Sequence, residues 1–196
     1  MLDETALFLH RVVADLPVRN RLSRPAALST GRFSKSALCL TCSTRPLLDE
    51  VGLLSALAWY AEGLTKRSGI EAFVDVQSQD FPRLAPEVET AVFRIVQEAL
   101  TNVFRHSEAR KVWISLHQKN GAILVSVLDD GKGIDQRIAE LRPGKVGVGI
   151  GGIKQRALEF GGELRLSNTH PGALLGLTIP STSTLREPKA VLNGCL

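Results

Sequence analysis

The chain has 196 residues, of which 44% are hydrophobic and 22% charged, and 24 basic against 20 acidic side chains give a net charge of +4. A chain of this length forms one domain with appendages or two small domains, and it buries enough surface to need no disulfide or metal. The composition excludes collagen-like, disulfide-scaffold and wholly disordered proteins.

The first 45 residues differ from the rest of the chain. They carry seven basic and three acidic side chains, whereas residues 46–196 carry equal numbers of each. Residues 2–16 have the apolar spacing of a short amphipathic helix, and the Pro- and Ser-containing stretch 17–46 predicts an irregular segment. The neutral bulk of the chain excludes an electrostatic nucleic-acid binder.

The cysteines and the absence of a signal peptide predict a cytoplasmic protein. The chain has three cysteines, an odd number that indicates free thiols in a reducing compartment. Cys39 and Cys42 form a CxxC pair without a second pair of ligands nearby, which disfavours a zinc or redox site. No stretch approaches the roughly 18 consecutive apolar residues of a membrane span.

Regular elements are predicted from residue 47 onward. Residues 47–69 have helical spacing and end at Gly69, and residues 70–77 alternate as a strand does. The longest periodic helix follows Pro86. Its apolar residues form one stripe, which consists of Val88, Val92, Ile95, Val96, Ala99 and Val103.

The second half of the chain predicts four strands and one helix. Strands 112–118 and 122–128 are joined by Asn120-Gly121, a hairpin signal. A glycine-rich region leads into a helix that ends at Gly161-Gly162, and two strands follow, 163–167 and 173–179. This order predicts an α+β fold, a two-layer sandwich of a mixed β-sheet with helices on one face.

The long helix carries the first candidate site. On a regular helix Glu98, Asn102 and Arg105 lie within about 60° of one another, beside the apolar stripe, with His106 next to them. An Asn inside a helix disfavours the helix, so its presence calls for a reason. Two interpretations are open: a solvated flank with i,i+4 contacts, or oxygen ligands and cations that converge on a Mg²⁺–phosphate group.

Two glycine-rich turns follow this helix. Residues 129–133 (DDGKG) end a strand, and their glycines let a ligand approach the backbone closely. Gly147, Gly149 and Gly152 have GxGxxG spacing, but a polar loop, 135–146, precedes them in place of a strand, which excludes a dinucleotide fold. What remains is a flexible loop and a helix N-terminus, which together favour an anion site.

The order and spacing of these segments resemble the nucleotide-binding boxes of the GHKL superfamily, which includes gyrase, heat-shock chaperone, histidine kinase and mismatch-repair ATPases. The strings RIVQEALTNVFRHSEA, VLDDGKGI and GVGIGGIKQRALEFGGELRL are similar to the catalytic domain of sensor histidine kinases that partner LuxR-type response regulators. RPLLDEVGLLSALAWYAEGLTKRSGI is similar to the stretch that joins the dimerisation helices to that domain. The resemblance covers about residues 46–180 and implies the GHKL (Bergerat) ATP-binding fold.

The resemblance implies a phosphate and metal site on the long helix. Glu98 would orient a water molecule or act as a base, and Asn102 would coordinate Mg²⁺. Arg105 and His106 would lie near the phosphates of ATP. Phosphoryl transfer depends on positioning and charge neutralisation, which this set of side chains can supply.

The remaining matched residues would form the adenine pocket and the lid. Asp129 would recognise the adenine amine, and Ala173 stands where the family commonly has Thr. Gly131 and Gly133 would shape the pocket. Gly147 and Gly149 would form the hinge of the lid and offer amides to the phosphates. Gly152 would also belong to the nucleotide site, and Gly172 matches the last glycine of the family, ahead of the final strand.

The phosphoacceptor is where the chain departs from these kinases, which place it in a helix within an ELHD-like string. The four histidines are His10, His106, His117 and His170, and of these Leu9-His10 alone is superficially similar. Arg11 follows it in place of Asp. We therefore expect the acceptor histidine to come from another protein.

The sequence thus predicts the ATP- and Mg²⁺-binding catalytic domain of a two-component sensor histidine kinase. Its partners would be ATP, a histidine-containing dimerisation domain and a LuxR-type response regulator. Two alternatives are open: a non-enzymatic ATP-binding regulatory module, and an anti-sigma-type serine kinase, which lacks a segment like 47–70. The expected division is an N-terminal segment, a helical connector, the ATP-binding domain and a flexible tail, at residues 1–45, 46–70, 71–182 and 183–196.

Overall fold

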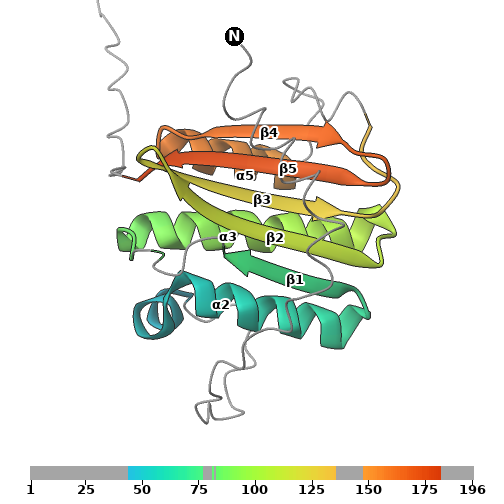
Figure 1. The fold of residues 1–196 in the computed structure, drawn as a ribbon, viewed down its shortest axis with the longest axis horizontal. Coiled ribbons are helices and arrows are strands. Elements are labelled where there is room, and N and C mark those ends of the chain that lie inside the picture. The colour runs from blue at the N-terminus through green and yellow to red at the C-terminus, as the bar shows by residue number, and fades with distance from the viewer. Residues whose placement is uncertain (1–43, 77–80, 82, 136–147, 182–196) are drawn as a thin grey trace, which may run out of the picture. The chain divides into compact units, whose positions relative to one another are not determined.

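The structure, a computed structural model, describes residues 44–76, 81, 83–135 and 148–181. Apart from Thr44, these residues belong to the second of two units into which the chain divides, 1–44 and 45–196. A five-stranded sheet forms the front layer of this unit in Figure 1, and helices lie behind it. The predicted α+β sandwich with a mixed sheet is confirmed.

The sheet has the strand order β1-β2-β3-β5-β4. The strands are β1 (Glu71–Val76), β2 (Lys111–Lys119), β3 (Ala122–Asp129), β4 (Glu163–Asn168) and β5 (Ala173–Pro180). β1 and β2 are parallel and all other neighbours antiparallel. A parallel pair needs a long crossover, and here the segment between β1 and β2 supplies it with a helix.

The hairpin between β2 and β3 has the turn that its sequence predicts. Asn120 and Gly121 both have positive φ, 51° and 71°, as a two-residue type I′ turn requires. The turn fixes the register, in which Lys119 pairs with Ala122 and Val112 with Asp129. The last residue of β3, Asp129, therefore lies beside the beginning of β2.

Three α-helices pack with the sheet: α2 (Thr44–Ser68), α3 (Pro86–Asn102) and α5 (Val148–Glu159). A π-helical turn, η1 (Val103–Ser107), continues α3. The predicted apolar stripe of α3 is buried in the core, with every member at most 7% exposed. α3 lies behind the central strands and packs against α5 (Figure 1).

The connector helix α2 is part of the same core. It lies along β1 (Figure 1), and its residues Leu48, Leu53, Leu57 and Leu64 are buried in one cluster with the stripe of α3. The helix is not continuous, because Gly52 has φ 78° and ψ 167° and bends it. The spacing of residues 47–69 predicted the helix but not this bend.

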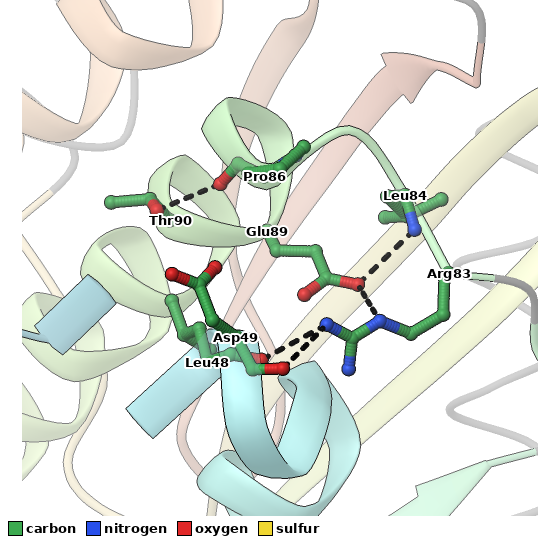
Figure 2. A network of polar contacts seen from close by, with 7 residues as sticks. All are labelled: Leu48, Asp49, Arg83, Leu84, Pro86, Glu89 and Thr90. Atoms are coloured by element: carbon green, nitrogen blue, oxygen red, sulfur yellow. Dashed lines mark hydrogen bonds and ion pairs between the residues drawn. The ribbon is translucent and has the colours of Figure 1, made fainter. Parts of the chain in front are cut away.

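A polar network holds the first part of α2 to the beginning of α3 (Figure 2). Glu89, whose side chain is 3% exposed, accepts a hydrogen bond from the Leu84 amide at 3.1 Å and pairs with Arg83 Nε at 3.4 Å. Arg83 Nη2 in turn donates to the Leu48 carbonyl at 3.1 Å and to that of Asp49 at 3.5 Å. Gly52 has positive φ, which favours glycine, and a Cβ there would overlap the Arg83 guanidinium and push this side chain out of the network.

Candidate functional site

The first part of the site lies where the end of α3 meets the first turn of α5. Glu98 and Asn102 are half-buried and one helical turn apart on α3. A Cβ on Gly149 would overlap Glu98 Oε1 and would lie 3.6 Å from Asn102 Oδ1. The carboxylate, the amide oxygen and the first turn of α5 are therefore in direct contact, and a glycine is what lets them approach.

The electrostatics of this contact suit an anion and a cation together. The first amides of a helix have no intrahelical partner and carry the positive end of the helix dipole, which attracts phosphate groups. Glu98 and Asn102 supply oxygen atoms, the ligands that Mg²⁺ prefers beside phosphates. Over the described residues no group of three or more His, Cys, Asp or Glu side chains could hold a metal ion. A cation here would need further ligands from a bound molecule.

The second part of the site is the end of β3. Asp129 is 6% exposed, and its Oδ1 accepts a hydrogen bond from the Gly131 amide at 2.8 Å. The backbone of Ala173 also donates to the carboxylate. Burial raises the pKa of Asp129, and these hydrogen bonds oppose that effect only in part. A buried carboxylate of this kind is a strong acceptor for a donor on a ligand.

Gly172 fixes the turn between β4 and β5 against this aspartate. It has φ 93°, and a Cβ there would overlap the Asp129 carbonyl oxygen. No other residue type fits both the conformation and the space. The matched glycine therefore brings the last two strands to the end of β3.

The loop that follows Asp129 connects the two parts of the site. The Lys132 amide donates to the Ser107 carbonyl at 2.9 Å, and a Cβ on Gly131 would overlap the same oxygen. Ser107 is the last residue of η1, which begins directly after Asn102. The end of α3 and the loop after β3 therefore touch, and the structure brings Glu98, Asn102 and Asp129 to neighbouring elements.

Two further residues hold this loop, and the sequence analysis missed both. Asp130 Oδ1 accepts the Arg110 and Lys111 amides, each at 2.8 Å. Asn168 at the end of β4 pairs twice with Ile134, accepting from its amide at 2.7 Å and donating to its carbonyl at 2.8 Å. An Asn at the end of a strand could have indicated this contact in the sequence. Asn is uncommon in strands, and its side-chain amide forms hydrogen bonds with the backbone of loops.

The remaining predicted residues lie apart from these contacts or outside the described part of the chain. Arg105 lies in η1 and borders a different cavity, next to α2, and His106 is exposed on the same turn. Gly152 lies within α5, where a Cβ would meet only Arg156 Nη1 at 3.5 Å, an ordinary contact. Gly147 falls outside the described residues. The phosphate-binding roles of these four residues stay predictions.

Comparisons with known proteins find relatives of one kind. The profile of the histidine kinase-, DNA gyrase B- and HSP90-like ATPases matches residues 87–183. Over 145 residues the chain is 33% identical to the sensor histidine kinase MctS of Rhizobium johnstonii, which covers 74% of this chain and 31% of MctS. Over 135 residues it is 36% identical to the sensor histidine kinase LiaS of Bacillus subtilis, which covers 67% of this chain and 35% of LiaS. The chain spans about a third of the length of these relatives.

A solved structure shares the fold. The histidine kinase domain of the blue-light activated histidine kinase from Erythrobacter litoralis EL346 superposes with a TM-score of 0.54 at 25% sequence identity. The superposition covers 66% of this chain and 61% of that one. The family match at residues 87–183 spans the elements that carry Glu98, Asn102, Asp129 and Gly149.

Proposed function

Residues 87–183 belong to the histidine kinase-, DNA gyrase B- and HSP90-like ATPases, and from this premise we propose that the chain is the catalytic domain of a sensor histidine kinase. It binds ATP with Mg²⁺ and transfers the γ-phosphoryl group to a histidine of a protein. The observation that supports this best is the contact of Glu98 and Asn102 with the glycine that opens α5. At that contact, oxygen atoms that could bind Mg²⁺ lie next to the first backbone amides of α5, which have no partner within the helix.

The adenine end of the nucleotide is assigned to Asp129. Its buried carboxylate, held by the Gly131 and Ala173 amides, accepts a hydrogen bond from the exocyclic amine. Gly133 and Gly172 both have positive φ and lack a Cβ, so Asn168 can pack against Gly133 and the Asp129 backbone against Gly172, which positions the loop and the turn around Asp129. Since the Ala173 backbone makes the bond to Asp129, the missing Thr hydroxyl at this position leaves that bond intact.

The phosphate end is assigned to α3 and α5. Mg²⁺ bound to the triphosphate neutralises the negative charge that hinders attack on the γ-phosphorus. Asn102 Oδ1 would hold this ion, and the first amides of α5 would hold phosphate oxygens. Glu98 would act as a base toward the acceptor imidazole or orient a water molecule, as the resemblance implies.

The acceptor histidine comes in trans in this proposal. His117 is buried in β2, His106 is exposed in η1, and His170 precedes Pro171 in the turn between β4 and β5. His10 lies outside the described residues. The partners are a histidine-containing dimerisation domain and, by resemblance, a response regulator of the LuxR type.

We place this activity in the cytoplasm, where ATP is available. Within the ranges that the structure describes, no helix has both the length and the apolar character needed to cross a bilayer. The free thiols that the cysteine count predicts are in keeping with this compartment.

A labelling experiment tests the proposal. The full chain is mixed with γ-labelled ATP, Mg²⁺ and a separate histidine-containing dimerisation domain, and we expect acid-labile label on that domain. Asn102→Asp should lower the transfer rate at least about tenfold by disturbing the metal site. Asn120→Asp, in the exposed hairpin turn, is the matched control and should retain the rate.

The other outcomes identify the alternatives. Acid-stable label would indicate a serine kinase of the anti-sigma type. Nucleotide binding without any transferred label would indicate a regulatory module that binds ATP. Equal rates for both Asn variants would remove Asn102 from the metal site.

A further inference from the structure

A cavity separate from the candidate nucleotide site lies between α2 and the end of α3. Its volume is about 140 Å³, and its apolar walls are Tyr60 and Leu64 of α2 and Phe104 of η1. Tyr60 is fixed from the core side by an edge-on contact with Phe93, at 5.8 Å between ring centroids. The cavity therefore has a rigid apolar floor at the surface of the molecule.

Phe104 is unusually exposed for a large aromatic side chain, with 56% of its surface accessible. It occupies the second position of η1, two residues after Asn102. The π-helical turn changes the direction of the side chains that follow α3, and such turns occur frequently at functional sites. An exposed aromatic at the edge of an apolar cavity is typical of an anchor for a protein partner.

Two guanidinium groups border the same cavity. Arg67 of α2 and Arg105 of η1 both line it, and both are exposed. In the part of the chain that the structure describes, neither has an ion pair or hydrogen bond to another side chain. By contrast, the neighbouring Lys66 is paired with Glu62 at 2.6 Å. The rim thus presents two positive charges that no described carboxylate neutralises.

We propose that this cavity docks an acidic protein segment that places an apolar side chain against Phe104 and carboxylates against Arg67 and Arg105. The proposal rests on the proposed function, because the partner it names is the protein that supplies the acceptor histidine. A segment bound here would contact η1, which begins directly after Asn102 in the chain. The partner would therefore bind on the α2 side of α3, whereas Glu98 and Asn102 contact α5.

The chemistry of the cavity favours a protein over a nucleic acid or a free phosphate. Its apolar lining is formed by Tyr60, Leu64 and Phe104. A phosphate group has no apolar surface that these side chains could bury, so contact with them would not favour its binding. Residues 46–196 carry no net charge, so the surrounding field does not attract a polyanion. An acidic segment with an apolar side chain complements both the floor and the rim.

The test uses two variants of the cavity and two matched controls. Phe104→Ala removes the aromatic anchor, and Arg67→Glu reverses the charge of the rim. Leu158→Ala removes another exposed apolar side chain, 52% accessible, and Arg156→Glu reverses another exposed charge; both lie on α5. Calorimetry measures the affinity of each protein for the histidine-containing dimerisation domain used in the labelling experiment, and separately for ADP.

We expect both cavity variants to weaken binding of the domain at least about tenfold, since central aromatic and arginine contacts contribute most to such interfaces. Their affinity for ADP and their melting temperatures should match those of the two controls. Binding of the domain by the native chain should also weaken with added salt, because it depends on charge.

The results separate this proposal from the proposed function. Domain binding that depends on Phe104 and Arg67 but leads to no transferred label would support the docking site and contradict the kinase activity. Label transfer with equal affinity of all variants, or absence of domain binding, would overturn the docking site. Binding of a phosphate ion alone, lost in Arg67→Glu and unchanged in Phe104→Ala, would also overturn it.

Discussion

At the scale of single residues, the structure explains why an acidic residue at the end of β3 can serve a ligand. Asp129 is nearly inaccessible, yet its hydrogen bonds from two backbone amides hold the carboxylate in place. Burial raises its pKa, so ionised Asp129 makes the native state less stable than a neutral group of the same shape would. A buried charged residue that reduces the stability of the fold is a candidate for a functional role.

We predict that Asp129→Asn lowers the affinity for ADP at least about tenfold, because a charge-assisted hydrogen bond to a buried carboxylate contributes about 1.5–3 kcal/mol. Calorimetric titration measures this. Asp130→Asn is the matched control, since its amide oxygen can still accept the Arg110 and Lys111 amides. Equal affinities of both variants would remove Asp129 from the adenine site.

The same variant has a pH signature. Because the pKa of Asp129 is higher in the native state than in the unfolded chain, stability decreases as the pH rises from the ordinary Asp value through the raised value. Asp129→Asn does not titrate. Urea unfolding should therefore find the variant more stable than the native chain at pH 7, and the difference should shrink as the pH falls below the raised value.

At the scale of elements, the sequence predicted what depends on local pattern. The stripe of α3, the Asn-Gly hairpin and the similarity to sensor histidine kinases are all confirmed. It did not predict the widening of α3 into η1 or the bend of α2 at Gly52, because both depend on contacts with distant segments. The projection of Arg105 beside Glu98 assumed a regular helix, and the structure has a π-helical turn at that position.

The first turn of α5 offers a comparison of two glycines. Gly149→Ala should lower ADP affinity at least about tenfold, because the added Cβ overlaps Glu98 Oε1 and forces this carboxylate to turn away. Since that oxygen ends a flexible side chain, the fold should lose less than about 1 kcal/mol. Gly151→Ala, with no atom within 4 Å of its Cβ, should instead stabilise the helix by about 0.5–1 kcal/mol and keep the affinity. Calorimetry and urea unfolding measure both, and identical behaviour of the two variants would contradict the contact.

At the scale of the whole molecule, the connector α2 and the helix α3 form one packed unit. α2 and α3 share a hydrophobic cluster, and Arg83 and Glu89 join their first turns (Figure 2). The ion pair itself contributes little because the Arg83 side chain is 59% exposed. The buried carboxylate of Glu89 and its bond to the Leu84 amide matter more.

Glu89→Ala should therefore lower the free energy of unfolding by about 1–3 kcal/mol, because it leaves the Leu84 amide without its acceptor. Urea denaturation is the measurement. Glu62→Ala removes another carboxylate of an ion pair, but an exposed one on α2, and should change stability by less than about 0.5 kcal/mol. Equal losses would mean that the network contributes no more than a surface pair.

The shared core of α2 and α3 also determines where a truncation can begin. The family match begins at residue 87, but the apolar stripe of α3 is covered in part by α2, which begins at Thr44. A fragment cut at the start of that match would expose this stripe to water and would lack β1 as well. The autonomous folding unit therefore includes the connector, and the family match alone underestimates its extent.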